Sequence, residues 1–280
     1  MIGQISALKQ IDNLIKSGFP RFIIITGQKG QGKTKLANRI ATKLNILMIE
    51  IGNKTDNIRD MIQMSYKQAE PIIYLIQDAD NMSLNAKNSL LKVIEEPPNN
   101  AYFIMELQQI ENTLETIKSR CQEIKMDKYT DKELHQMIDK LNPNLTESEL
   151  LLLKEIGENY YQLEMLIKYD IKDFYNYVTK VYENIYKVQS ANSFKLSEKL
   201  DIKNTGDGYD LELFFNTYCY IAYNDMLSCT ADNFNEIIDK IAKCIQITCN
   251  YKNKLRISNI NKQFLLDNWI LDIRKEWLTL

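Results

Sequence analysis

Histidine is almost absent from this sequence, and its cysteines form no metal-binding pattern. His135 is the single histidine among 280 residues, which argues against Ser-His-Asp or Cys-His catalysis. The five cysteines include no Cys-x-x-Cys pair, so the sequence predicts neither zinc nor a disulfide framework. We expect buried, reduced thiols at these positions: Cys121, Cys219, Cys229, Cys244 and Cys249.

The sequence also lacks a strong net charge and long apolar stretches. The formal net charge is −2 at pH 7, so any DNA contact should be local or shared with partners. No apolar run approaches the roughly 20 residues that span a bilayer. The opening residues MIGQISALKQ lack the basic and apolar regions of a signal peptide. We therefore expect a cytoplasmic protein without membrane contact.

A glycine-rich segment is the first feature that points to chemistry. Residues 27–34 read GQKGQGKT and fit G-x-x-x-x-G-K-[ST], a loop whose backbone N–H groups surround phosphates. It lies between an apolar run at 22–25 and helical spacing at 33–44, which is the context of a phosphate loop. The candidate nucleotide-binding residues are Gly27, Gly30, Gln31, Gly32, Lys33 and Thr34.

Two of these residues have predicted roles toward ATP or ADP. Lys33 is placed to reach the β and γ phosphates, and the Thr34 hydroxyl can ligate Mg²⁺. The helix that begins at the loop would add the positive end of its dipole to the phosphate site.

Strand and helix patterns alternate through the first part of the chain and predict a parallel α/β sheet. The expected strands are 22–25, 46–51, 72–76, 101–107 and 122–126. The expected helices are 4–17, 33–44, 56–69, 83–95 and 113–120, with Asp56 and Ser83 as predicted N-caps.

Beyond residue 127 the pattern becomes helical. Three short helices are expected at 130–141, 146–155 and 160–169, separated by Asn142-Pro143-Asn144 and by Gly157. Long helices follow, interrupted at residues 204–208. We predict three domains: an α/β nucleotide domain at 1–127, a small three-helix domain at 128–170 and an all-α domain at 171–280.

The acidic residues expected beside a hydrolytic phosphate loop are incomplete. Such sites usually carry two carboxylates directly after the third strand, whereas this chain continues Gln77-Asp78-Ala79-Asp80. Asp78 is the candidate catalytic and Mg²⁺-binding carboxylate. Asp80 is an alternative that could equally cap a turn. The pattern predicts weakened hydrolysis.

Three further segments carry a family resemblance. DADNMS at 78–83, NSLLKVIEEPPNNAYFIM at 88–105 and LETIKSRCQ at 114–122 closely resemble bacterial clamp-loader subunits, above all the delta-prime type of DNA polymerase III. The resemblance covers roughly residues 1–170. It implies an AAA+ fold with a C-terminal helical collar, in an open ring that loads a sliding clamp onto primed DNA. The implied partners are motor and delta-type subunits, the clamp and primer–template DNA. Lys87 and Lys92 lie where relatives face the DNA, but a solvated helix face explains them equally well.

The resemblance also implies a role for Arg120 in the SRC motif. In this family that arginine reaches in trans to the ATP of an adjacent motor subunit and stabilises transition-state charge. Without the family, Arg120 is equally well a cation at a helix C-terminus, where the dipole favours it.

Several positions depart from the motor subunits of the family. Those carry Asp-Glu where this chain has Gln77-Asp78, and a sensor arginine where alignment on Gly157 puts Tyr160. Gln108 is the nearest candidate for the other sensor. Residues 35–75 contain no cysteine, so the zinc module of many relatives is missing. The combination predicts a subunit that holds nucleotide without efficient turnover.

Two other functions stay open at this point. One is a motor ATPase of the same machine, in which Asp78 or Asp80 replaces the missing carboxylate. The other, more remote, is a small-molecule kinase. A kinase needs a lid with arginines, and no arginine occurs between Lys125 and Leu255.

Overall fold

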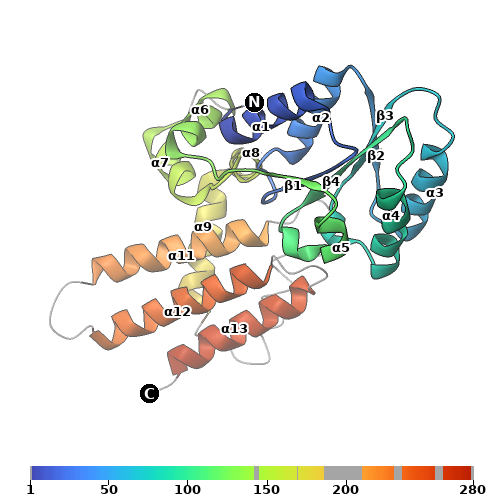
Figure 1. Cartoon of the computed structure of the whole chain (residues 1–280). Helices are drawn as coiled ribbons and strands as arrows, with labels where there is room; N and C mark the ends of the chain where they lie inside the picture. Colours follow the sequence, from blue (N-terminus) through green and yellow to red (C-terminus); the bar gives the residue numbers. More distant parts are fainter. Residues whose placement is uncertain are drawn as a thin grey trace. The chain divides into compact units, whose positions relative to one another are not determined.

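The computed structural model describes residues 2–141, 145–168, 170–185, 210–229, 235–255 and 261–278 (Figure 1). They fall into two compact units. The first contains the residues up to Glu133 together with Asn159–Tyr161, and the second contains the other described residues. The predicted breaks at 142–144 and 204–208 lie outside the described residues. The division into three domains remains a prediction.

The first unit is built on a five-stranded sheet in which every pair of neighbours is parallel. The strand order is β2-β3-β4-β1-β5, so the predicted parallel α/β sheet is confirmed. The strands are β1 Phe22–Thr26, β2 Leu47–Ile51, β3 Ile72–Ile76, β4 Ala101–Leu107 and β5 Gln122–Lys125. Because the strands are parallel, their carboxyl ends, and the loops that follow them, lie at one edge of the sheet.

Helices alternate with these strands as the periodicity predicts. They are α1 Ile5–Ser17, α2 Lys33–Leu44, α3 Thr55–Ser65, α4 Leu84–Glu95 and α5 Glu115–Lys118, with 3₁₀ turns η1 Ala79–Asn81 and η2 Ile110–Asn112. The N-cap prediction is confirmed for Ser83, whose hydroxyl accepts from the Ala86 N–H at 3.1 Å.

The prediction was wrong at both ends of α3. Lys54 is the N-cap residue, and Asp56 lies in the first turn, where a carboxylate is still favoured by the helix dipole. The helix ends at Ser65 instead of continuing to residue 69, because the chain turns there and the Lys67 N–H donates to the Met64 carbonyl.

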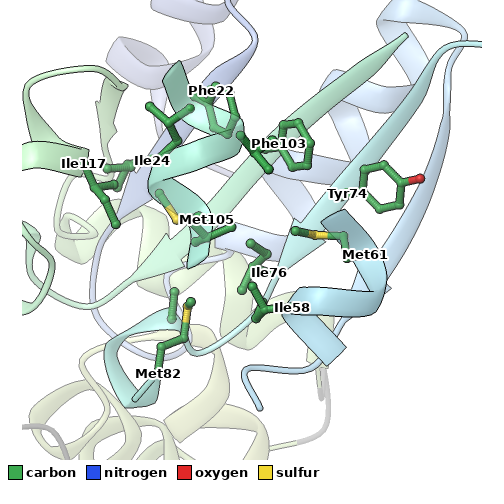
Figure 2. Packing of buried hydrophobic residues seen from close by; sticks show 14 of the residues in the cluster. Phe22, Ile24, Ile58, Met61, Tyr74, Ile76, Met82, Phe103, Met105 and Ile117 are labelled. Carbon is green, nitrogen blue, oxygen red and sulfur yellow. The ribbon is translucent and has the colours of Figure 1, made fainter. Parts of the chain in front are cut away.

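Each face of the sheet carries its own hydrophobic core, because successive side chains of a strand point to opposite faces. Figure 2 shows the first core, in which Phe22 stacks on Phe103 at 4.6 Å between ring centroids and α3 contributes Ile58 and Met61. The second core joins alternate strand residues such as Ile25 and Ile104 to the apolar faces of α1 and α2. Thus α2, which begins at the phosphate loop, is anchored by buried residues: Leu36, Ala37, Ile40 and Ala41.

The second unit is helical. Its elements are α6 Asp131–Leu141, whose first turn belongs to the first unit, α7 Glu147–Ile156, α8 Tyr160–Lys168, α9 Ile171–Asn184, α11 Leu211–Ser228, α12 Asn235–Lys254 and α13 Lys262–Leu278. Trp269 is fully buried among Phe214, Phe215 and Tyr218, and its indole N–H donates to the Thr248 hydroxyl at 3.0 Å. None of the helices that the structure describes is both long and apolar enough to cross a membrane.

The cysteines match the expectation only in part. All five are free thiols, but only Cys244 is buried, whereas Cys249 is exposed and the others are intermediate. The expectation of buried thiols was therefore wrong for Cys249, which lies on the exposed side of α12. Burial raises the pKa of Cys121 and of Cys244 to about 12, so these two thiols stay protonated and unreactive at neutral pH.

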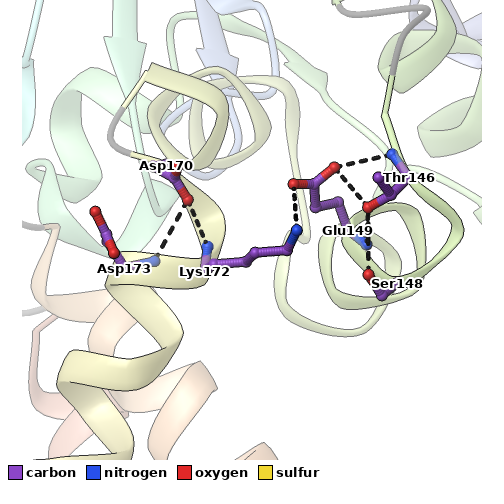
Figure 3. A network of polar contacts seen from close by, with 6 residues as sticks. All are labelled: Thr146, Ser148, Glu149, Asp170, Lys172 and Asp173. Atoms are coloured by element: carbon purple, nitrogen blue, oxygen red, sulfur yellow. Dashed lines mark hydrogen bonds and ion pairs between the residues drawn. The ribbon is translucent and has the colours of Figure 1, made fainter.

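A capping box starts α7. The Glu149 carboxylate accepts from the Thr146 N–H at 2.8 Å and from the Thr146 hydroxyl at 2.6 Å, and Lys172 of α9 pairs with it at 3.0 Å (Figure 3). The pKa of Glu149 is lowered from its ordinary value of 4.5 to about 2. The largest cause is the hydrogen bond from the Thr146 hydroxyl, followed by the bond from the Thr146 N–H and then by Lys172. The carboxylate thus links the start of α7 to α9.

We expect the stabilisation by Glu149 to depend on pH with a defined sign. Because the pKa is lowered on folding, its contribution is complete above the ordinary pKa of 4.5 and fades as the pH falls toward about 2. Glu149→Ala should lower the urea midpoint at pH 7 and do so progressively less at acidic pH. Tryptophan fluorescence reports this unit, because both tryptophans, Trp269 and Trp277, lie in α13.

The matched control is Glu147→Ala, which removes a carboxylate from the same first turn. It should affect the midpoint less than Glu149→Ala at pH 7. A Glu149→Ala effect that is constant between pH 7 and pH 2 would contradict the proposed linkage.

Candidate functional site

The phosphate loop lies at the carboxyl edge of the sheet, between β1 and α2. The Gly27 N–H donates to the Leu107 carbonyl at 3.0 Å, so the start of the loop is tied to the end of the neighbouring strand β4. Gly30 and Gly32 have φ values of 84° and 91°, which side chains rarely tolerate. The sequence therefore places glycine where this loop turns.

Lys33 is bound to the loop itself. Its ammonium donates to the carbonyls of Gly27 at 2.6 Å and Gln28 at 3.1 Å. The side-chain oxygen of the buried Gln31 accepts from the Gln28 N–H at 2.6 Å, and its carbonyl accepts from the Tyr129 hydroxyl at 2.6 Å. Gln31 thus shapes the loop, and an incoming phosphate would compete with two carbonyls for the Lys33 ammonium.

Burial lowers the pKa of Lys33, and the negative charges of Glu106, Asp80 and Asp78 oppose that shift. These carboxylates are therefore close enough to Lys33 to act on it electrostatically. Together they make the surroundings of the loop less positive than the sequence of the loop alone indicates.

Glu106 is a site residue that sequence reasoning missed. The Thr34 hydroxyl donates to Glu106 Oε2 at 3.1 Å, and the Glu106 side chain is only 6% exposed. Burial raises its pKa, while the Thr34 bond and Lys33 lower it. A signal was available, because Glu106 is the one charged residue in the strand AYFIMEL.

The two aspartates after β3 lie in different environments. Asp78 is exposed with a φ of 47°, whereas Asp80 is 4% exposed. The Asp80 carboxylate accepts from the Gln108 N–H at 2.8 and 3.0 Å and from the Asn112 side chain at 2.7 Å. Asp80 therefore holds the end of β4 and the turn η2 in place, so its bonds are used within the fold.

The residues Asn159–Tyr161 cover part of the phosphate loop. The Lys29 ammonium lies 4.1 Å from the Tyr161 ring centroid and donates to the Tyr161 hydroxyl at 3.0 Å. The Lys35 ammonium lies 4.1 Å from the Tyr160 ring centroid. A Cβ on Gly30 would meet the Asn159 side-chain oxygen at 2.2 Å, so the two segments touch. Tyr160, at the predicted sensor position, thus contacts a lysine of α2 and offers no cation of its own.

Arg120 follows α5 and is exposed. Its guanidinium donates to the Thr116 carbonyl at 3.0 Å and pairs with Glu95, at the end of α4, at 3.6 Å. The first contact is that of a cation at a helix C-terminus, and the second orients the guanidinium. Because 45% of the side chain remains exposed, a second partner can reach it.

The two lysines expected to face DNA differ. Lys87 is partly buried, and its ammonium donates to the Asn112 carbonyl at 2.5 Å. Lys92 is exposed. Only Lys92 is therefore placed to contact a phosphate backbone without breaking an internal bond.

Comparison with known proteins finds similarity to clamp-loader subunits over part of the chain. Residues 45–130 match the family model described as DNA polymerase III, delta subunit. The delta-prime subunit of Bacillus subtilis is 46% identical over 50 residues, which is 18% of this chain and 15% of that protein. The delta-prime subunit of Haemophilus influenzae is 37% identical over 71 residues, which is 24% of this chain and 21% of that protein. In these segments the chain is similar to clamp-loader subunits.

Longer but weaker similarity links this chain to other subunit types of DNA polymerase III. The gamma subunit of Buchnera aphidicola from Schizaphis graminum is 26% identical over 191 residues, 55% of this chain and 53% of that protein. The tau subunit of Bacillus subtilis is 22% identical over 249 residues, 75% of this chain and 44% of that protein. The chain spans about half the length of these relatives.

Solved structures support the AAA+ fold. A gamma-subunit-related protein from Thermotoga maritima superposes with a TM-score of 0.54 at 17% identity, over 98% of this chain and 99% of that one. The RuvB branch-migration motor of the same organism gives a TM-score of 0.51 at 16% identity, over 79% and 78%. At these identities the similarity concerns the fold alone.

The two aspartates that follow β3 should respond differently to the same substitution. Asp80→Asn removes a buried charge that accepts three hydrogen bonds and should destabilise the fold by about 1–3 kcal/mol. Asp78→Asn alters an exposed residue, and asparagine tolerates its positive φ, so we expect a change within about 0.5 kcal/mol. Urea unfolding followed by circular dichroism measures both. Equal losses for the two variants would refute this assignment.

Proposed function

We propose that this chain is a delta-prime-type subunit of the replicative clamp loader. In this proposal it binds ATP or ADP with little or no turnover of its own and supplies Arg120 in trans to a neighbouring ATPase subunit. It would work in the cytoplasm with motor and delta-type subunits, a sliding clamp and primer–template DNA. The proposal is carried by one observation: Arg120 is exposed and contacts Thr116 and Glu95, neither of which belongs to the chain's own phosphate loop.

Nucleotide binding is supported by the loop and the residues around it. Backbone N–H groups of the segment 27–34 and the start of α2 would bind the phosphates, and Lys33 would leave the carbonyls of Gly27 and Gln28 to join them. Mg²⁺, when bound, would neutralise phosphate charge next to Thr34. The rings of Tyr161 and Tyr160 contact the ammonium groups of Lys29 and Lys35 and cover part of the loop.

Slow turnover is supported by the side chains around the predicted phosphate site. Gln77 is an amide at a position where a hydrolytic site needs a carboxylate. The Asp80 carboxylate already accepts hydrogen bonds from Gln108 and Asn112. Asp78 is the remaining exposed carboxylate of that segment. Tyr160 offers no positive charge to a transition state. The chain therefore retains the parts that bind a nucleotide and has altered those that activate water.

A role for Arg120 in a neighbour's site fits its position. The guanidinium pairs with a partly exposed carboxylate, an arrangement worth only about 0–1 kcal/mol and thus easily exchanged for a phosphate. An arginine supplied in trans accelerates phosphoryl transfer by about 10³–10⁵-fold. Arg120 would thus contribute to a partner's catalysis although its own chain turns over slowly.

A motor ATPase of the same machine is the second candidate. It is favoured by the length of the similarity to gamma and tau subunits, which exceeds that to delta-prime subunits. In that case Asp78 would have to orient water from its exposed position. Substitution of Lys33 in the chain's own phosphate loop distinguishes a motor ATPase from a delta-prime-type subunit.

Arg120→Ala should slow ATP turnover strongly in a clamp loader reconstituted with motor and delta-type subunits, clamp and primed DNA. We expect a loss of at least about tenfold, because one of the transition-state cations is removed. Lys33→Ala should reduce total turnover little. Arg120→Lys should restore only part of the rate, because an ammonium cannot bind phosphate in the bidentate manner of a guanidinium.

The control is Arg59→Ala, which removes another exposed arginine, on α3. It should leave turnover unchanged. If Lys33→Ala removes a share of turnover comparable to Arg120→Ala, the chain is a motor subunit. If neither substitution matters in an assembled complex, the role proposed for Arg120 is wrong.

A further inference from the structure

Glu106 is a charged residue where the fold offers no obvious reason for one. It lies in β4, whose neighbours Met105 and Leu107 are buried in the first core. Strand alternation turns Glu106 to the opposite face, with Ile104, beneath the start of α2. A buried carboxylate is costly unless it is paired or coordinates a metal. An apolar side chain at this position would have continued the second core.

The carboxylate is only half satisfied. Glu106 Oε2 accepts from the Thr34 hydroxyl at 3.1 Å, whereas Oε1 is buried and has no hydrogen-bond partner. Lys33 binds the carbonyls of Gly27 and Gln28 instead of completing an ion pair with it. A nine-tenths buried, unpartnered oxygen beside the hydroxyl of the phosphate loop indicates that a further positive partner belongs there.

We propose that Glu106 is a ligand of the divalent cation of the nucleotide site and, with Thr34, compensates for the carboxylate missing after β3. The inference rests on the proposed nucleotide binding. It adds that Glu106 is the residue that makes nucleotide binding depend on the cation. Mg²⁺ is usually held by one or two carboxylates together with substrate phosphates and water, so a single buried glutamate suffices.

The geometry fits this role. Adjacent ligands of an octahedral Mg²⁺ ion, at about 2.0–2.1 Å from the metal, lie about 3 Å apart. Thr34 Oγ1 and Glu106 Oε2 are 3.1 Å apart. A cation could therefore contact both oxygens after the threonine proton turns away, with little movement of either side chain.

The other carboxylates of the site are less suitable. Asp80 accepts three hydrogen bonds from Gln108 and Asn112 and would have to release them. Asp78 is exposed, at the start of η1. Glu106 alone among the three combines burial, contact with Thr34 and an unused oxygen.

The charge of Glu106 should affect nucleotide affinity in opposite directions with and without the cation. Without a divalent cation the Glu106 carboxylate repels the phosphates of a nucleotide. With the cation it attracts the metal–nucleotide complex. Glu106 should therefore couple nucleotide affinity to the cation, whereas an acceptor that only holds Thr34 should not. Thermodynamic couplings of this kind are typically about 5–150-fold.

The test measures the affinity of the full-length chain for ADP and for ATP, in Mg²⁺ and in EDTA. The coupling is the ratio of the two dissociation constants, in EDTA over Mg²⁺. Glu106→Gln keeps the size and the acceptor for Thr34 but removes the charge. We expect it to bind metal-free nucleotide more tightly than wild type and to bind the Mg²⁺ complex more weakly, so that the ratio falls by at least about fivefold.

A matched control exists in the same unit. Glu123 on β5 also accepts a threonine hydroxyl, from Thr26 at 2.6 Å, but that threonine belongs to β1 and not to the phosphate loop. Glu123→Gln should leave the ratio unchanged. Glu106→Asp, which keeps the charge but shortens the side chain, should retain weak metal-free binding and lose part of the Mg²⁺ effect.

Electron paramagnetic resonance with Mn²⁺ gives a readout independent of nucleotide affinity. In the presence of ADP, wild type should hold Mn²⁺ more tightly than Glu106→Gln. An unchanged coupling ratio, or an equal loss of affinity in both buffers, would overturn the assignment of Glu106 while leaving nucleotide binding intact. Failure of wild type to bind either nucleotide in either buffer would overturn the proposed nucleotide site and Glu106 with it.

Discussion

The pairing of β1 with β4 is the constraint on which the rest of the site depends. Its register sets Thr26 opposite Leu107, and the first amide of the phosphate loop then bonds the Leu107 carbonyl. Because parallel strands end at the same edge, the loop after β1 and the segment after β4 must meet. Everything that acts on a phosphate bound there is positioned relative to this pair.

The same pairing decides how the buried charges of the site are distributed. Glu106 reaches Thr34 because it precedes the last residue of β4 and faces α2. Asp80 reaches Gln108 because the turn after β3 passes the end of β4. Lys33 meanwhile binds carbonyls of its own loop. The charged side chains near the loop are thus divided between holding the fold, as Asp80 does, and lining the predicted phosphate site, as Glu106 does.

Arg120 belongs to a different part of the same unit. It follows α5 and is oriented by Glu95 from the end of α4, and these two helices pack beside the core of Figure 2. This ion pair restrains the Arg120 side chain while leaving it exposed, which suits the role in a partner's site that we propose for it. In the proposed assembly one chain would combine a covered phosphate loop of its own with a cation directed outward.

Much of the fold and part of the site could be predicted from the sequence, for local reasons. The apolar runs at 22–25 and 72–76 became the fully buried strands β1 and β3, and Ser83 became an N-cap, because these features depend on neighbours in the chain. The Asp56 cap and the length of α3 were predicted wrongly, because propensity does not specify where a helix turns back toward the sheet. Exposure of Cys249 could not be predicted either, since it depends on which side of α12 is covered.

By itself, then, the sequence determined the parallel α/β sheet, the phosphate loop and the clamp-loader motifs, because periodicity, glycine placement and spacing are properties of contiguous residues. Only the tertiary structure decided that Glu106 joins Thr34, 72 positions away, and that Tyr161 meets Lys29, 132 positions away. It also decided that Asp80 is satisfied within the fold while Asp78 is exposed. These outcomes depend on strand order and register, which bring distant residues to one edge of the sheet.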